Sequence, residues 1–120
     1  MQTMNEAMLR RLRRVAEANL NEMAVVTRQG EAASDGMGGW GDASQVAGTL
    51  RCRRVSTLSQ PEQRIAERMA VVRPWIVHLP AGSDVREQDT LTISGDVLEV
   101  VHVARSSWEA VRRVLCRAVE

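Results

Sequence analysis

Lysine, phenylalanine and tyrosine are absent from this chain, and tryptophan occurs only three times. All sixteen basic residues are arginine. Schiff-base catalysis by a lysine and the P-loop both need a lysine ammonium, so the sequence excludes both. Because so few aromatic side chains are present, we expect a core built mainly from Val, Leu, Ile, Met and Ala.

Cysteine is also scarce, since the chain has only Cys52 and Cys116. Two cysteines so far apart, with no secretory leader before them, predict reduced buried thiols in an intracellular protein rather than a disulfide framework. The first 23 residues contain four arginines and no apolar run of membrane length. We therefore expect neither a signal peptide nor a spanning helix.

The remaining composition is that of an ordinary globular protein. The chain has 120 residues, of which 44% are hydrophobic and 26% charged, and its formal net charge is +1. This length fits one domain, and the charge balance predicts no general attraction to nucleic acid or anionic lipid.

Residues 4–22, within an N-terminal region 1–22, predict an amphipathic helix. Thr3 and Glu6 have the spacing of a capping box, which would start the helix. Arg10, Arg13 and Arg14 fall largely on the polar side, where a solvated face is the commoner interpretation and a partner contact the alternative. The apolar side repeats with a period of about 3.6 residues, through Met8, Leu9, Leu12, Val15, Ala16 and Leu20.

Residues 29–44 are rich in Gly, Ala, Ser and Asp and contain Trp40. Such a segment buries too little apolar area to offset its backbone entropy, so we expect a flexible loop. Its glycines lack the Gly-Lys-Ser/Thr ending of a phosphate loop.

The rest of the chain, 23–120, predicts a small β-barrel domain around that loop. Alternation predicts strands over 46–53 and 69–79, and a hairpin joins 90–93 to 97–103 through a turn at Ser94-Gly95-Asp96. Residues 60–68 fit either a turn of helix started by Pro61 or an extended crossover. Residues 108–119 fit both a strand, with Val114, Cys116 and Ala118 inward, and a helix. The fold class is therefore mainly β, and the expected core contains Trp75, Val77, Leu79, Leu91, Ile93, Leu98 and Val100.

Three kinds of chemistry have candidate residues, and each has a simpler explanation. Cys52, His78, His102 and Cys116 are metal-ligand types, but they lack the close pairing that zinc sites show. Ser106 and Ser107 stand in no nucleophile-elbow motif. Carboxylates at Asp84, Glu87 and Asp89 suit a solvated turn better than an acid–base pair. We therefore expect no catalytic, cofactor or metal site.

One stretch resembles a known family. Residues 73–89 read RPWIVHLPAGSDVREQD and are followed by Gly95, Leu98, Glu99 and Val100. This pattern, within residues 70–119, resembles the head-tail adaptor and stopper (head-closure) proteins of tailed bacteriophages. Those proteins often carry a Trp strand ending in Leu-Pro, an Asp-Val-Arg turn and a Gly hairpin before a Glu-Val strand. Two positions depart from the pattern: Gln88 stands where glycine is usual, and Leu98 where Tyr or Phe is common.

The resemblance implies a structural virion protein of the head-tail connector, or neck, assembled in the host cytoplasm. Its subunits would form a sixfold or twelvefold ring between a portal or adaptor ring above and a tail-terminator or stopper ring below. DNA would pass through the channel without sequence-specific binding, and no membrane, cofactor or catalysis would be involved. The residues expected at the partner interface are Trp40, Arg10, Arg13, Arg14, Arg51 and Arg53.

Two other classes of function stay open from the residues alone. A small barrel could be an OB-like module that binds single-stranded nucleic acid, although stacking would depend on the three tryptophans. A small hydrolase would need active residues that no motif identifies.

Overall fold

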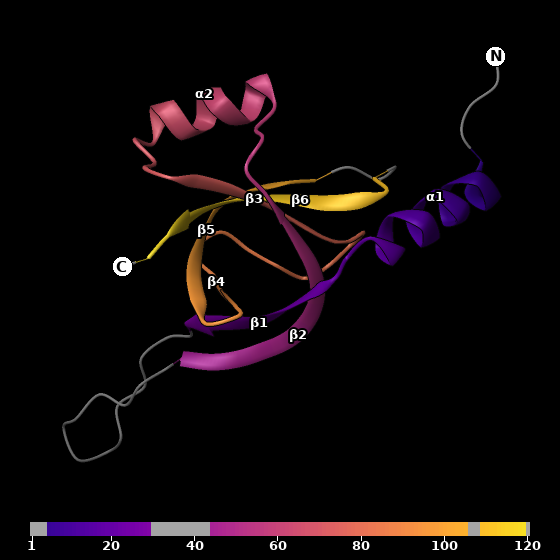
Figure 1. Ribbon diagram of the computed structural model, residues 1–120, viewed down its shortest axis with the longest axis horizontal. Coiled ribbons are helices and arrows are strands. Elements are labelled where there is room, and N and C mark those ends of the chain that lie inside the picture. The colour runs from indigo at the N-terminus through magenta and orange to yellow at the C-terminus, as the bar shows by residue number, and fades with distance from the viewer. Residues whose placement is uncertain (1–4, 30–43, 106–108, 120) are drawn as a thin grey trace.

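The computed structural model describes residues 5–29, 44–105 and 109–119. These residues form an outer helix, a closed barrel and a second short helix (Figure 1). The predicted fold class is confirmed as mainly β, with an N-terminal helix and a small barrel. Of the flexible loop expected over 29–44, residues 30–43, including Trp40, lie outside the described residues, whereas Gln29 and Ser44 at its two ends are strand residues. In chain order the elements are α1 (Glu6–Ala18), β1 (Glu22–Gln29), β2 (Ser44–Val55), α2 (Gln60–Arg68), β3 (Pro74–Pro80), β4 (Thr90–Ile93), β5 (Asp96–Ala104) and β6 (Val111–Ala118).

The barrel has six antiparallel strands in the order β1-β2-β3-β6-β5-β4. Strand β1 supplies the buried side chains of Ala24 and Val26 to its interior. The sequence analysis assigns no strand to this segment, because four apolar residues in a row fit a helix and a strand equally well. Only pairing with β2 and β4 decides it.

Strand β3 begins at Pro74, so the strand predicted over 69–79 is too long at its start. Residues 69–73 instead form the turn that leaves α2. Ala70 and Arg73 there have φ angles of 53° and 54°, which an extended strand does not allow. The final segment, for which the pattern left two alternatives, is strand β6.

The predicted hairpin is confirmed. Ile93 pairs with Asp96, and the two residues between them, Ser94 and Gly95, have φ angles of 50° and 85°. Positive φ at both central positions is the mark of a type I′ turn, whose twist matches that of the flanking strands.

The main core fills the barrel with aliphatic side chains and both cysteines. Six of the seven predicted core residues are buried, while Trp75 is partly buried and packs against the core from its edge. Cys52 and Cys116 are buried free thiols, as the sequence predicted. Of the inward residues proposed for the last strand, Val114 and Cys116 belong to this core and Ala118 packs against it.

A second, smaller core lies outside the barrel under α2. Ala66 on α2 packs with Ile76 of β3 and Leu115 of β6. Helix α2 is the helical alternative for residues 60–68, and Ser59 begins it with a capping box. The Ser59 hydroxyl accepts from the Glu62 amide at 3.3 Å, and the Glu62 carboxylate accepts from the Ser59 amide at 2.8 Å.

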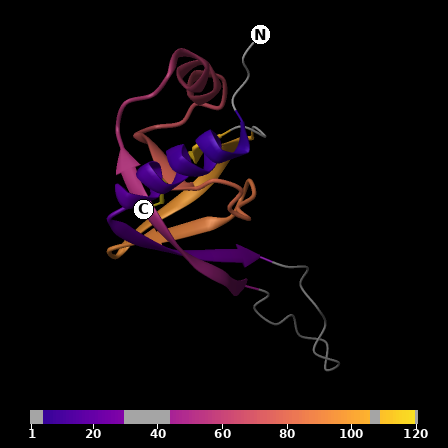
Figure 2. The same cartoon turned by 90° about the vertical axis from the view of Figure 1, so that its right-hand side faces the viewer.

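Helix α1 is shorter than the predicted span 4–22, and Asn5 caps it rather than Thr3. The Asn5 side chain accepts from the Met8 amide at 2.8 Å, which satisfies one free donor of the first turn. Thr3 lies outside the described residues. The helix lies on the outside of the barrel, where it contacts β3 and β6 (Figure 2).

Candidate interaction surfaces

The arginines predicted to contact a partner occupy two elements. Arg10 and Arg14 are exposed on α1, whereas Arg13 is half-buried. The Arg13 Nε donates to the Glu109 carbonyl at 3.0 Å, a bond that holds α1 to the segment before β6. Of these three predicted contacts, Arg10 and Arg14 are therefore the two that are exposed to another molecule.

Arg51 and Arg53 are exposed on β2, on the outer side opposite the buried Cys52. In the register Arg51 pairs with Met23 and Arg53 with His78. Met23 is also exposed, so this outer face combines positive charge with apolar area. Trp40, the other predicted contact, lies outside the described residues.

Arg54, the next residue along β2, has a different role. Its guanidinium binds Glu22 at 2.8 Å and Asp96 at 2.7 Å, and it lies 6.0 Å from the centre of the Trp75 ring. The hydrogen bonds that Arg54 donates to both carboxylates raise its pKa. This one side chain therefore ties β2 to the start of β1, the β4–β5 turn and β3.

Arg113 on β6 joins α2 to the barrel. Its Nε and Nη2 donate to the two oxygens of Glu62 at 2.9 Å and 2.8 Å, and its Nη1 lies 2.8 Å from the His78 Nε2. Glu62 is buried, which opposes its charge, but the bonds from Arg113 and Ser59 lower its pKa to about 2. The carboxylate is thus charged and fully engaged at neutral pH.

The loop of residues 81–89 is held at both ends. Near its start, Gly82 donates its amide to the Glu109 carboxylate at 2.9 Å, and Arg112 donates to the Ser83 carbonyl at 2.8 Å. At its end, Arg28 of β1 donates twice to Asp89, at 3.0 Å and 2.9 Å. Asp89 is buried and also accepts from the Arg86 amide, so its role is to fix the turn into β4.

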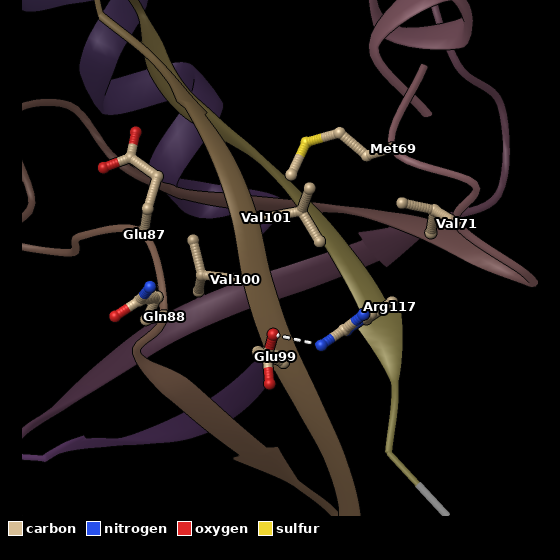
Figure 3. A pocket seen from close by; sticks show the side chains of 8 residues that line it. All are labelled: Met69, Val71, Glu87, Gln88, Glu99, Val100, Val101 and Arg117. Carbon is tan, nitrogen blue, oxygen red and sulfur yellow. Dashed lines mark hydrogen bonds and ion pairs between the residues drawn. The ribbon is translucent and has the colours of Figure 1, made fainter. Parts of the chain in front are cut away.

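A shallow pocket of about 340 Å³ lies on the outer side of β5 (Figure 3). Met69 and Val71, from the turn after α2, line one side, and Glu87 and Gln88 of the loop line the other. Its remaining lining comes from β5 and β6, through Glu99, Val100, Val101 and Arg117. Arg117 donates to Glu99 at 2.6 Å. The sequence analysis missed this pocket, because it forms only where three distant segments meet.

The residues weighed as metal ligands do not converge. Cys52 and Cys116 lie in the main core, whereas His78 is bound to Arg113 beside α2. Burial raises the pKa of Cys52 to about 11 and raises that of Cys116 as well, so both are protonated thiols with little reactivity. Across residues 5–29, 44–105 and 109–119, no group of three or more His, Cys, Asp and Glu side chains is placed to hold a metal ion.

Comparisons with known proteins add no assignment. No family model, curated protein or solved structure matches this chain. Within the described part of the chain, no helix combines the length and the apolar character needed to span a bilayer.

Proposed function

We propose that this protein is a structural subunit of the head-tail connector of a tailed bacteriophage, an adaptor or stopper that forms a ring between portal and tail. The observation that carries the proposal is the closed barrel with a helix packed on its outside, together with the resemblance of residues 73–89. Those residues form β3 and the braced loop into β4.

The internal ion pairs support a structural role. Arg28, Arg54 and Arg113 are each bound to carboxylates of other elements. Groups that are satisfied within the subunit hold its shape and are not left to bind a substrate. A rigid barrel with contact surfaces on its outside suits a ring component, which must keep its form while neighbours attach. In this proposal the protein catalyses no reaction, and DNA passes it without sequence-specific binding.

Imaging of the assembled connector tests the proposal. The tagged full chain is produced together with the portal and tail components of its phage, and the particles are imaged by electron microscopy. We expect a closed ring of this protein at the neck, with a symmetry that follows the neighbouring ring. Complete necks that lack the protein, or a protein that stays monomeric in the presence of the portal, would contradict the proposal.

Trp40 gives a second test of the same proposal. We expect Trp40→Ala to reduce incorporation into connectors, because a large aromatic side chain in a polar segment is a typical interface anchor. Hydrogen exchange of residues 30–44 should be slower in the connector than in the free subunit. Equal exchange in both states together with normal incorporation of Trp40→Ala would remove this segment from the interface.

The nucleic-acid-binding alternative is less well supported. OB-like modules stack bases on exposed aromatic side chains, whereas Trp75 is partly buried against the core with Arg54 over its ring. Anisotropy of a labelled single-stranded oligonucleotide distinguishes the two functions. Tight binding that weakens steeply with salt would favour the alternative.

A further inference from the structure

Helix α1 leaves half of its apolar side uncovered. Leu9 is buried against the barrel, but Met8, Leu12 and Val15 are 48%, 41% and 60% exposed. Spacings of four and three residues place these three side chains in one stripe along the helix. Arg11, four residues before Val15, lies beside the stripe and is exposed as well. We call Met8, Leu12 and Val15 the helix stripe.

The pocket on β5 is the start of a longer groove that is lined by both apolar and charged side chains. A second hollow of about 300 Å³ adjoins it, shares Glu99 and Arg117, and is lined further by Ala70, Val72 and Val119. Met69, Val72 and Val119 are 53%, 76% and 47% exposed. Exposed apolar side chains gathered in this way along a groove are typical of a protein–protein contact. We call the two hollows together the β5 groove.

We propose that the helix stripe of one subunit docks in the β5 groove of a second copy of this chain. A helix with apolar side chains at such spacings is the usual occupant of an apolar groove. This inference deepens the proposed function and rests on it, since it names the contact between neighbouring subunits of the ring.

The positions of the two surfaces fit a ring. In Figure 1, α1 lies on the right of the barrel, whereas β5 and the end of α2 lie on the left. A contact between two different surfaces repeats from copy to copy, and it closes into a ring when each step turns slightly. The more subunits the ring has, the smaller this turn, and the closer the two surfaces come to lying on opposite sides.

Charge favours the same pairing. Helix α1 carries four arginines and two glutamates, whereas the two carboxylates of the groove, Glu87 and Glu99, are paired with Arg105 and Arg117, so the groove is close to neutral. Arg11 at the border of the helix stripe would thus approach a surface without excess positive charge, which does not repel it. Two copies of α1 packed against each other would instead bring their arginines together.

Crosslinking between variants that each carry one added, exposed cysteine tests the contact. Val15→Cys and Met69→Cys both replace exposed side chains, so neither should disturb the fold. The native cysteines are fully buried and unreactive toward a short bismaleimide. When the two full-length variants are mixed, we expect at least about tenfold more covalent dimer than with either alone, because docking raises the local thiol concentration.

Matched controls use exposed positions outside both surfaces. Ala7→Cys replaces the helix partner and Arg64→Cys, on α2, replaces the groove partner. Neither control pair should crosslink above background. If Val15→Cys alone crosslinks as efficiently as its mixture with Met69→Cys, two copies of α1 pair with each other. If no mixture crosslinks, the helix stripe contacts a different protein. Either result would overturn the inference.

A substitution in the helix stripe gives an independent measurement. Val15→Glu places a carboxylate where the groove is apolar, so we expect self-association in sedimentation velocity to weaken by about tenfold or more. Ala7→Glu is the control and should associate as the unchanged protein does. Unchanged association of Val15→Glu would contradict the proposed contact.

The connector experiment separates this inference from the proposed function. Rings at the neck without crosslinking of Val15→Cys to Met69→Cys would disprove the contact and leave the function standing. Efficient crosslinking in a protein that never joins the portal would leave the contact standing and disprove the function.

Discussion

Gln88 occupies a turn position whose backbone conformation is unfavourable for a residue with a side chain. Its φ angle is 76°, a left-handed conformation that costs a residue with a Cβ about 1–2 kcal/mol. The Gln88 amide still donates to the Val100 carbonyl at 2.8 Å, so the surrounding turn imposes the strain.

We therefore expect Gln88→Gly to stabilise the protein by about 0.5–1 kcal/mol, the relieved strain less the added chain entropy. Urea unfolding followed by circular dichroism measures the change. Arg86→Gly, at an exposed position of the same loop whose φ is not positive, is the control and should destabilise the protein. Equal effects of both substitutions would show that Gln88 is unstrained.

His78 is the residue whose protonation the fold opposes. Burial, followed by the positive charges of Arg113 and Arg53, lowers its pKa, and Glu62 offsets this only in part. The unfolded chain therefore takes up a proton at a higher pH than the folded protein does. The free energy of unfolding should fall as pH drops below about 6.5, the ordinary pKa of histidine.

His78→Gln tests this pH dependence, because a glutamine can accept from Arg113 without titrating. As the pH falls from 7.5 to 5.5, the free energy of unfolding should decrease more for the original protein than for the variant. Urea unfolding at several pH values across this range measures it. A difference that stays constant with pH would show that His78 protonates equally in both states.

At the scale of elements, hydrogen bonds at both ends of α2 stabilise the helix. The capping box of Ser59 begins the helix. At the other end, Val71 donates to the Ala66 carbonyl and Ala70 to the Glu67 carbonyl, at 2.8 Å and 3.1 Å. This pair of bonds is a Schellman motif, and it turns the chain so that Met69 and Val71 line the β5 groove.

Ser59→Ala should cost about 1 kcal/mol, because it leaves a helix donor without its side-chain acceptor. Thermal unfolding by circular dichroism gives the change in stability. Ser56→Ala, at an exposed position before the helix, is the control and should have little effect. A loss no larger than that of the control would show that the cap does not hold α2.

At the scale of the whole molecule, neighbouring strands of the barrel pair over different lengths. We call the paired stretch between two strands a seam. The β2–β3 seam has only three paired positions, Arg53 to Val55 against His78 to Ile76, whereas β3 and β6 pair along seven. Arg54 lies within the short seam and links it to Glu22 and Asp96. Ion pairs and the stacking on Trp75 therefore reinforce the barrel where backbone pairing is least extensive.

We expect amides of Arg53–Val55 to exchange faster with solvent than those of β6, since local opening follows the weaker pairing. Arg54→Met should accelerate exchange at this seam, and it should cost about 1 kcal/mol by leaving Glu22 without its guanidinium partner. Hydrogen exchange followed by mass spectrometry measures both effects. Uniform acceleration across all strands would show that Arg54 supports global stability and not this seam.

Local patterns in the sequence determined several features of this protein. The alternation of small aliphatic residues predicted most of the barrel core, because side chains of a strand point alternately to its two faces. Gly95 in a polar turn predicted the hairpin. The scarcity of aromatics predicted an aliphatic core, which the structure confirms with valine, leucine, isoleucine and alanine beside the two cysteines. The methionines also expected there are exposed wherever the structure describes them, at Met8, Met23 and Met69.

Tertiary structure alone decided the rest, because those features depend on residues far apart in the chain. Strand β1 needed β2 and β4 beside it, and β6 was chosen over a helix because β3 and β5 flank it. No sequence pattern pairs Arg113 with Glu62 or Arg28 with Asp89, which are brought together only when the barrel closes. The same is true of the groove and the half-covered helix, since periodicity shows that a side chain is apolar but not which neighbour covers it.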